Sequence, residues 1–227
     1  MKICGLQKLT ALDFPGRIAC TIFTPGCNLR CGFCHNAALV TASPPDMDAE
    51  EIFAYLRKRR GVLEGVALTG GEPLLQEGLA DFLREVKALG YAVKLDTNGC
   101  FPGALEARVG EGLVDYVAMD IKNSPERYAA TCGREVDMAA IERSIAVIMN
   151  SGVDYEFRTT VVNPLHSDGD IEKMGELIRG ARRWYLQNFV DSGGLIGGGF
   201  SSLGKEHMEE MASIARRFVE NVEIRGI

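Results

Sequence analysis

The sequence predicts a parallel α/β fold, in which short buried strands alternate with amphipathic helices. Six short apolar runs follow one another along the chain, and segments with helical periodicity separate them. The 227 residues are enough for one domain with a large core, and no repeat or linker interrupts the pattern. We therefore expect a single domain over residues 1–227, with too few units for the eight of a closed TIM barrel.

The expected strands have the length and the apolar, β-branched composition of buried strands. They cover Ile18–Phe23, Glu64–Leu68, Tyr91–Leu95, Val114–Met119, Tyr155–Val162 and Arg183–Phe189, followed by a last extended stretch at Val222–Ile224.

The segments between these strands carry apolar residues three and four positions apart, as amphipathic helices do. The apolar faces contain Ile52, Phe53 and Leu56; Leu79, Phe82, Leu83 and Val86; Ile141, Ile145 and Ile148; Ile171, Met174, Leu177 and Ile178; and, in a final helix, Met208, Met211, Ile214, Ala215 and Phe218. Asp48 and Glu51 have the spacing of a capping box at the start of the first helix.

Charge and hydropathy exclude several classes of protein. The net charge is −6, and the one basic run, 57–60, closes a predicted helix, where cations suit the helix dipole. Nucleic acid is therefore not expected as a partner. No apolar run approaches the ~20 residues of a membrane helix, so we expect no membrane span.

Three cysteines, Cys27, Cys31 and Cys34, lie within eight residues at C-x3-C-x2-C spacing. Three thiolates so closely spaced can bind one face of an iron–sulfur cube, which normally takes four cysteines. One iron would then be open to another ligand, and an open metal position indicates chemistry rather than structural bracing.

Three other interpretations of these cysteines fit the sequence less well. Cys31 to His35 has the C-x-x-C-H pattern of covalent haem attachment, but residues 1–20 lack a signal peptide core. A zinc site would need a fourth ligand at suitable spacing, and His35 is too close to Cys34. A disulfide framework fits poorly with an odd number of cysteines. The remaining cysteines, Cys4, Cys20, Cys100 and Cys132, are expected to be free and buried.

The cysteine spacing, with the aromatic Phe33 before the last cysteine, resembles the signature of the radical S-adenosylmethionine superfamily. The resemblance implies an open (β/α)6 partial TIM barrel and a [4Fe-4S] cluster held by Cys27, Cys31 and Cys34. It also implies that S-adenosylmethionine chelates the open iron, with its adenine against the backbone of Phe33. The cysteines follow the first strand, at the sheet edge where parallel α/β folds bind ligands.

Polar groups follow the next strands at the same edge. After the second strand comes Thr69-Gly70-Gly71-Glu72-Pro73, which by itself could be a plain turn before a helix. It resembles the family's G-G-E-P motif, which implies that Gly70, Gly71 and Glu72 hold the amino group of the cofactor.

The third and fourth strands lead into Asp96-Thr97-Asn98-Gly99 and Asp120-Ile121-Lys122. Alone, these could be a turn and a surface cation. They resemble strings of glycyl-radical-enzyme activases, which implies that Asp96, Thr97, Asp120 and Lys122 contact the ribose and carboxylate of the cofactor. Asp96 and Asp120 could also flank a monovalent cation, because hard cations prefer oxygen ligands.

Further candidates lie on the later strands and before the cysteines. Arg158 is a charged residue within a strand and is expected to meet the cofactor carboxylate or a peptide substrate, although it could instead face outward and pair with an acid. Gln187 is a weaker candidate, as a polar residue that lines the cofactor site. Asp13 to Arg17 resembles a D-x-P-G segment of the activases, and Asn36 completes their C-H-N string.

The glycine-rich stretch 193–199 is expected to be a flexible segment that could admit a macromolecular substrate. Gly199 to Lys205 has Walker A spacing, but Glu206 stands where the motif needs Ser or Thr, so no phosphate loop is expected. The stretch from Asn188 to Ser202 follows no pattern of the family.

Nearly the whole chain resembles the compact activases, above all the anaerobic ribonucleoside-triphosphate reductase activating proteins, through residues 115–122 and 155–162. This implies hydrogen abstraction from a glycine of a partner enzyme, with an external donor such as flavodoxin or ferredoxin, in the cytoplasm. Three alternatives stay open: an activase of the pyruvate formate-lyase type, an iron–sulfur electron carrier or sensor, and a radical enzyme for a small molecule.

Overall fold

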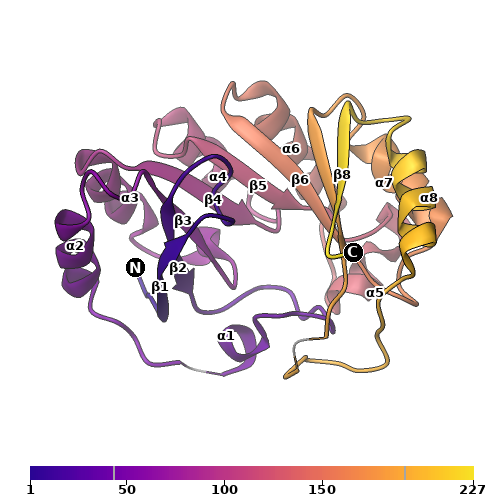
Figure 1. Cartoon of the computed structure of the whole chain (residues 1–227), viewed down its shortest axis with the longest axis horizontal. Helices are drawn as coiled ribbons and strands as arrows, with labels where there is room; N and C mark the ends of the chain where they lie inside the picture. The colour runs from indigo at the N-terminus through magenta and orange to yellow at the C-terminus, as the bar shows by residue number, and fades with distance from the viewer. Residues whose placement is uncertain (43, 192) are drawn as a thin grey trace.

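The computed structural model describes residues 1–42, 44–191 and 193–227. Its centre is an eight-stranded sheet in which the strands lie side by side in chain order. The strands are β1 (Gly5–Thr10), β2 (Ala19–Thr24), β3 (Gly65–Gly70), β4 (Ala92–Thr97), β5 (Tyr116–Asp120), β6 (Asp154–Val161), β7 (Arg183–Asn188) and β8 (Asn221–Arg225). β1 runs antiparallel to β2, and all later pairings are parallel. The sheet curves into an open barrel with β1 and β8 at its edges (Figure 1).

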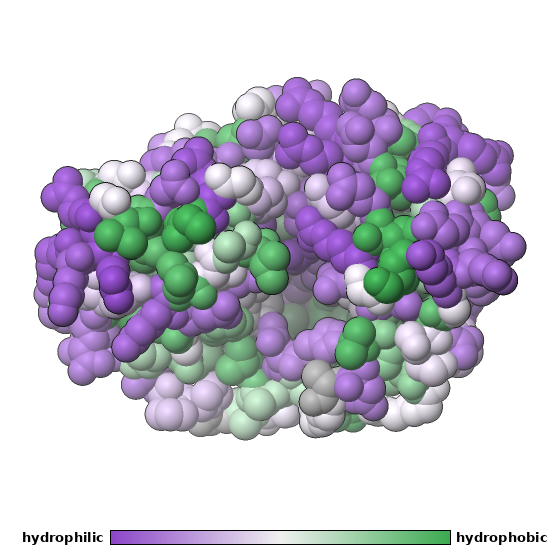
Figure 2. All heavy atoms as spheres, viewed as in Figure 1, coloured by the Kyte–Doolittle hydropathy of each residue, from purple (hydrophilic) through white to green (hydrophobic). Residues whose placement is uncertain are grey.

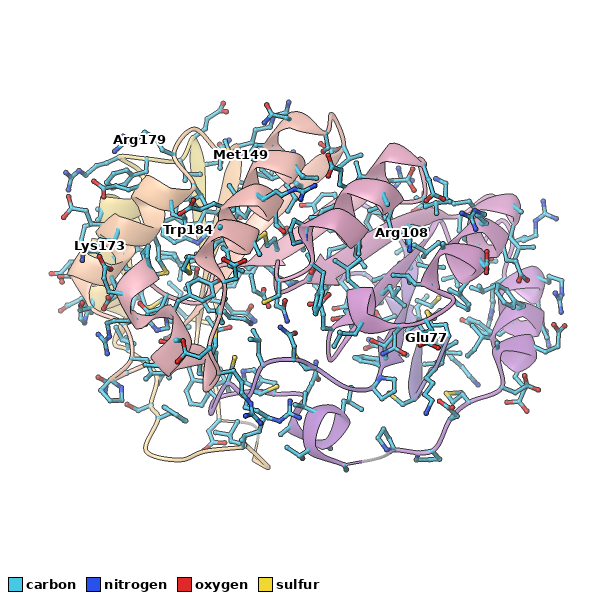
Figure 3. All side chains as sticks on the ribbon, turned by 180° about the vertical axis from the view of Figure 1, so that it is seen from behind. Glu77, Arg108, Met149, Lys173, Arg179 and Trp184 are labelled. Atoms are coloured by element: carbon cyan, nitrogen blue, oxygen red, sulfur yellow. The ribbon has the colours of Figure 1, made fainter. Side chains whose placement is uncertain are left out.

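The helices are α1 (Ala37–Thr41), α2 (Ala49–Lys58), α3 (Leu79–Ala88), α4 (Pro102–Gly110), α5 (Tyr128–Cys132), α6 (Met138–Asn150), α7 (Asp168–Leu177) and α8 (Lys205–Ala215), with short 3-10 helices at Pro73–Leu75 and Pro125–Arg127. The longer helices cover the outer, convex face of the sheet, whereas the short α1 lies below the sheet in the view of Figure 1 (Figure 3 shows the helices from behind). Asp48 caps α2, since its carboxylate accepts a hydrogen bond from the N–H of Glu50 at 2.9 Å.

The two faces of the sheet differ in chemistry because side chains alternate along each strand. On β4, Val93 and Leu95 are fully buried in the large apolar core shared with the helices. Lys94 and Asp96 lie on the other face, which lines the barrel lumen. Phe14 packs on Tyr116 at a ring distance of 5.9 Å and belongs to a small apolar cluster at the lower end of the lumen. The lumen is therefore apolar near the amino ends of the strands and polar toward their carboxyl ends.

The fold prediction is confirmed in its main features. The six predicted strands correspond to β2–β7, and the last extended stretch corresponds to β8. Strand β1 was missed, because this antiparallel edge strand has a mostly exposed or half-exposed sequence, with Leu9 62% exposed. Helix α4 was missed too, since Leu105 is its one buried side chain in the described structure. Within the described residues, no helix is long and apolar enough to cross a membrane.

Candidate functional site

A cavity of about 260 Å³ lies at the carboxyl ends of the parallel strands. Residues in the last part of each strand from β3 to β7, or in the segments that follow β2 to β5 and β7, form its wall, as expected for parallel strands that end at one edge. Eleven of the twelve predicted site residues line it: Cys27, Cys31, Phe33, Cys34, Gly70, Gly71, Asp96, Thr97, Asp120, Lys122 and Arg158. Glu72 lies behind this wall, and Gln187, Asn36 and His35 also line the cavity.

Hydrogen bonds within the loop hold the segment with the three cysteines in shape. The N–H of Cys34 donates to the carbonyl of Cys31 at 3.1 Å. The guanidinium of Arg30 donates to the carbonyls of Cys27 and Leu29 at 2.6 and 2.7 Å. The N–H of Leu29 points at the sulfur of Cys27 at 3.4 Å, a hydrogen bond that a thiolate ligand would keep. The loop is thus closed by local contacts.

The thiols differ in their surroundings. Burial raises the pKa of Cys27 and of Cys34. A hydrogen bond with the thiol of Cys132 lowers the pKa of Cys31 to about 7, against the effect of burial, and the charge of Lys122 adds to the lowering. The carbonyl of Cys132 also accepts from the N–H of Arg30 at 2.8 Å, which fixes the end of α5 to the loop. The position of Cys132 beside this loop depends on tertiary packing and could not be predicted from the spacing of the cysteines.

The cysteine thiols fit an iron–sulfur cube better than a single metal ion. Among residues 1–42, 44–191 and 193–227, no three Cys, His, Asp or Glu side chains converge as ligands of one ion. A tetrahedral zinc site needs such convergence. In a cube, each cysteine binds a different iron, so three thiols spread along one cavity wall match its donor set.

Gly70, the last residue of β3, and Gly71 allow the loops after β2 and β3 to approach closely. A Cβ on Gly71 would lie 1.8 Å from the carbonyl oxygen of Gly26, and Gly70 has φ +119°. The N–H of Glu72 donates to that same carbonyl at 2.8 Å, and the amide of Asn36 donates to the carbonyl of Gly70 at 2.9 Å. Only glycine fits where these backbones meet.

Glu72 is fully buried and braces the site from behind the cavity wall. Its carboxylate accepts from the hydroxyl of Thr97 at 2.9 Å and from the N–H groups of Asn98 and Leu74 at 2.7 and 3.1 Å. Burial raises the pKa of Glu72 to about 7, although these three donors oppose the rise. Pro73 begins a 3-10 helix, so the plain-turn interpretation of this segment is also observed.

Asn98 connects Glu72 to the cysteine loop. Its side-chain amide donates to Asn28 at 2.8 Å and lies 3.7 Å from the sulfur of Cys27. Asn98 was not among the predicted site residues, although it belongs to the string Asp96 to Gly99. A residue that connects two loops cannot be identified from the sequence, because its contacts depend on how the loops pack in the folded chain.

Charged side chains form a network on the lumen face. Arg158 points into the lumen and donates to Asp96 at 3.1 Å and to Asp120 at 3.0 Å, while Lys122 donates to Asp120 at 2.9 Å. Burial alone would raise the pKa of both carboxyls. The nearby cations outweigh it, lowering the pKa of Asp96 and bringing that of Asp120 to about 2. Both acids are therefore ionised at neutral pH.

Part of the glycine-rich segment lies against the cysteine loop. The N–H of Gly197 donates to the carbonyl of Gly32 at 2.8 Å, and the rings of Phe200 and Phe33 are 6.2 Å apart. Ile196 lines the cavity. Gly197 and Phe200 thus contact the cysteine loop, and the flexibility of the segment stays a prediction; Ser192 lies outside the described residues. The sequence showed only that this stretch is rich in glycine.

A second cavity, of about 420 Å³, leads from this site toward the open side of the barrel. It shares His35, Asn36, Asp96 and Gln187 with the first and reaches Asp13, as well as Gln7 on β1 and Val190 beyond β7. Figure 2 shows a hollow on this face, bordered on both sides by hydrophobic side chains.

Residues 21–178 match the family model of the radical SAM superfamily. The chain belongs to the radical SAM superfamily. The cofactors of this family are a [4Fe-4S] cluster and S-adenosylmethionine, and the donor set of the cavity fits both groups. The structure describes the residues that would hold them, three thiols beside a pocket with paired charges.

Two relatives narrow the family to the glycyl-radical-enzyme activases. The protein named "Putative glycyl-radical enzyme activating enzyme" of Methanocaldococcus jannaschii is 29% identical over 99% of this chain and 96% of its own length. The pyruvate formate-lyase-activating enzyme of Clostridium pasteurianum is 30% identical over 80% of this chain and 77% of its own length. The chain is thus a radical SAM enzyme of the activase group.

Solved structures agree on the fold. Streptococcus suis SuiB bound to S-adenosylmethionine matches with a TM-score of 0.67 at 16% identity, over 91% of this chain and 52% of that one. A domain of a pyruvate-formate lyase-activating enzyme from Bacteroides vulgatus matches with a TM-score of 0.59 at 19% identity, over 71% of this chain and 99% of that one. The open barrel is therefore the radical SAM fold.

Proposed function

We propose that this chain activates an anaerobic ribonucleoside-triphosphate reductase by generating a glycyl radical on it. The cavity residues would hold a [4Fe-4S] cluster and S-adenosylmethionine, and these groups would supply the one-electron reductive cleavage, to methionine and a 5′-deoxyadenosyl radical, that hydrogen abstraction from the glycine Cα requires. The observation that carries the proposal is the single cavity that joins the three cysteines to Asp96, Asp120, Lys122 and Arg158.

The roles proposed for the cavity residues are supported by their chemistry and position. Cys27, Cys31 and Cys34 would bind three irons of the cluster, and the backbone of Phe33 would lie against the adenine. The carbonyls of Gly70 and Gly71 would accept from the amino group. Lys122 and Arg158 would hold the carboxylate, because charge-assisted hydrogen bonds are the strongest available to it. Asp96 and Thr97 would hold the ribose.

Glu72 would act through its neighbours. From behind the cavity wall, Glu72 fixes Thr97 and Asn98, which line the cavity, so its contribution to binding the cofactor would be the position of that wall. This role differs from a direct contact with the amino group.

The open side of the barrel suits a macromolecular substrate. The second cavity runs from Asp96 and Gln187 to Gln7 on β1, so an extended glycine-containing segment could reach the cofactor from outside. The reductase is favoured by the strings at residues 115–122 and 155–162. A pyruvate formate-lyase is the second candidate, favoured by the relative from Clostridium pasteurianum.

Free thiols in the described residues fit a reducing compartment, so the proposal places the enzyme in the cytoplasm, with flavodoxin or ferredoxin as electron donor.

The proposal is tested in two steps. The protein is reconstituted anaerobically with iron and sulfide and reduced in the presence of S-adenosylmethionine, and 5′-deoxyadenosine is measured. Its absence would defeat the radical chemistry and favour an electron carrier. The protein is then mixed with the anaerobic reductase or with pyruvate formate-lyase, and the glycyl radical is sought by electron paramagnetic resonance. A radical on neither partner would favour a small-molecule substrate.

A further inference from the structure

The two carboxylates that were expected to flank a monovalent cation already have charged partners inside the chain. Asp96 accepts from Arg158 at 3.1 Å through one oxygen, and its other oxygen contacts the ammonium of Lys94. Asp120 accepts from Arg158 at 3.0 Å and from Lys122 at 2.9 Å, again through different oxygens. Each of the four carboxylate oxygens therefore faces a cationic donor.

Lys94 differs from the other two cations in its position. It lies two residues before Asp96 on β4, so both side chains project into the lumen from the same face. Its side chain is 2% exposed, and Lys is rarely so buried without a partner. Lys122 and Arg158 line the cavity, whereas Lys94 is not part of the described cavity wall. Lys94 is therefore placed to neutralise Asp96 without lining the cavity.

The charges leave no role for a further cation. Lys94, Lys122 and Arg158 bring three positive charges against the carboxylates of Asp96 and Asp120, which leaves one positive charge within this group of five side chains. Glu156, another buried lumen carboxylate, pairs with Arg225 at 3.5 Å and so has its own partner. The single excess charge matches the carboxylate of an amino acid ligand. A bound ion would add a like charge to the group.

We propose that Lys94 supplies from within the chain the positive charge that Na⁺ or K⁺ would bring to Asp96 and Asp120. Lys94 is then a positioning residue: it holds the Asp96 carboxylate in place without touching the cofactor. This inference rests on the S-adenosylmethionine site proposed above. It predicts an enzyme whose cofactor affinity does not depend on monovalent cations.

The test compares the wild type with Lys94→Met in the anaerobically reconstituted protein. Affinity for S-adenosylmethionine is measured with potassium and with tetramethylammonium, which is too large for the site, at constant ionic strength. We expect wild-type affinity to be the same in both salts. Lys94→Met should lose about tenfold in tetramethylammonium, a usual size for coupling between two sites, and regain it in potassium. A residue with only a structural role would show no such rescue.

The control is Lys173→Met on α7, where an exposed lysine pairs with Glu126 at 2.9 Å and lies near the outer edge of the molecule (Figure 3). This variant should bind the cofactor as the wild type does in both salts. The inference is overturned if potassium strengthens binding to the wild type about tenfold, or if Lys94→Met binds equally in both salts.

A second measurement needs neither cofactor nor a soluble variant. The melting temperature of the ligand-free wild type is followed as potassium replaces tetramethylammonium. An unchanged melting temperature supports the inference, and a saturable rise overturns it. This separates the two proposals, because a wild type that binds no S-adenosylmethionine in any salt defeats the proposed function while the melting data still test Lys94.

Discussion

The buried carboxylate of Glu72 accepts a hydrogen bond from the backbone N–H of Asn98 at 2.7 Å. This bond joins the loop after β3 to the loop after β4, and Asn98 in turn donates to Asn28 in the cysteine loop at 2.8 Å. Three segments from distant parts of the chain are thus held in one arrangement. The cavity wall depends on these bonds as much as on the residues that face the cavity.

Replacing Glu72 should change how stability depends on pH. The pKa of Glu72 is about 7 in the folded chain, mainly because of burial, and 4.5 is its ordinary value. Because its pKa is raised on folding, protonated Glu72 stabilises the folded state. This contribution to stability is complete below pH 4.5 and is lost as the pH rises from there through 7. We expect the wild type to lose up to about 3 kcal/mol relative to Glu72→Gln between pH ~4 and ~8. Denaturant unfolding of both apo proteins measures this, and parallel pH profiles would contradict it.

The three motif cysteines should be separately required for the cluster. Cys34→Ala removes one ligand and leaves two, so the protein should lose most of its iron and sulfide after anaerobic reconstitution. Cys4→Ser is the matched control, because Cys4 does not line the cavity and a hydroxyl can keep its hydrogen bond to the carbonyl of Phe23. The iron and sulfide contents of both variants are measured after reconstitution. Full iron content in Cys34→Ala would mean that another residue binds the cluster.

The sequence predicted the parts of this fold that have a local cause. Apolar runs predicted β2 to β7, and the rule that ligands meet the carboxyl ends of parallel strands placed Asp96, Asp120 and Arg158 together. Strand β1 escaped because an edge strand buries little and so has little apolar pattern.

The missed site residues share one cause. The contact of Cys132 with Cys31, the bonds of Asn98 and the pairing of Lys94 with Asp96 all depend on tertiary packing or on which face of a strand a side chain occupies. Lys94 in a strand could as well have been an exposed edge residue. Its 2% exposure and its contact with Asp96 show that it belongs to the buried charge network. Sequence pattern locates motifs, and packing determines their partners.

Replacing Arg158 should destabilise the fold and weaken cofactor binding. Arg158→Met leaves the carboxylates of Asp96 and Asp120 without their shared partner, and losing one member of a buried ion pair costs about 3–5 kcal/mol. The pKa of Asp120, about 2 in the wild type, should rise. A lowered pKa gives stability that is lost as the pH falls, so the variant should begin to unfold at a higher pH on acidification.

Arg158→Lys is the control for charge. It keeps the positive charge but lacks the planar fork that reaches both carboxylates, so it should lie between the wild type and Arg158→Met in stability and in S-adenosylmethionine affinity. Acid unfolding followed by circular dichroism and equilibrium binding provide the two measurements. If Arg158→Met matched the wild type in both, the network would have no part in the site.

Gly71 should tolerate no side chain. A Cβ there would lie 1.8 Å from the carbonyl oxygen of Gly26, a backbone atom that cannot move away without displacing the cysteine loop. Gly71→Ala should therefore lose more than about 3 kcal/mol of unfolding free energy, or fail to retain a cluster. Gly103→Ala in α4 is the matched control, because a Cβ there meets nothing within 4 Å and alanine favours the helix by up to about 1 kcal/mol. Denaturant unfolding and iron content after reconstitution should separate the two variants, and equal stability and iron content would show that the two loops need not approach as closely as the structure places them.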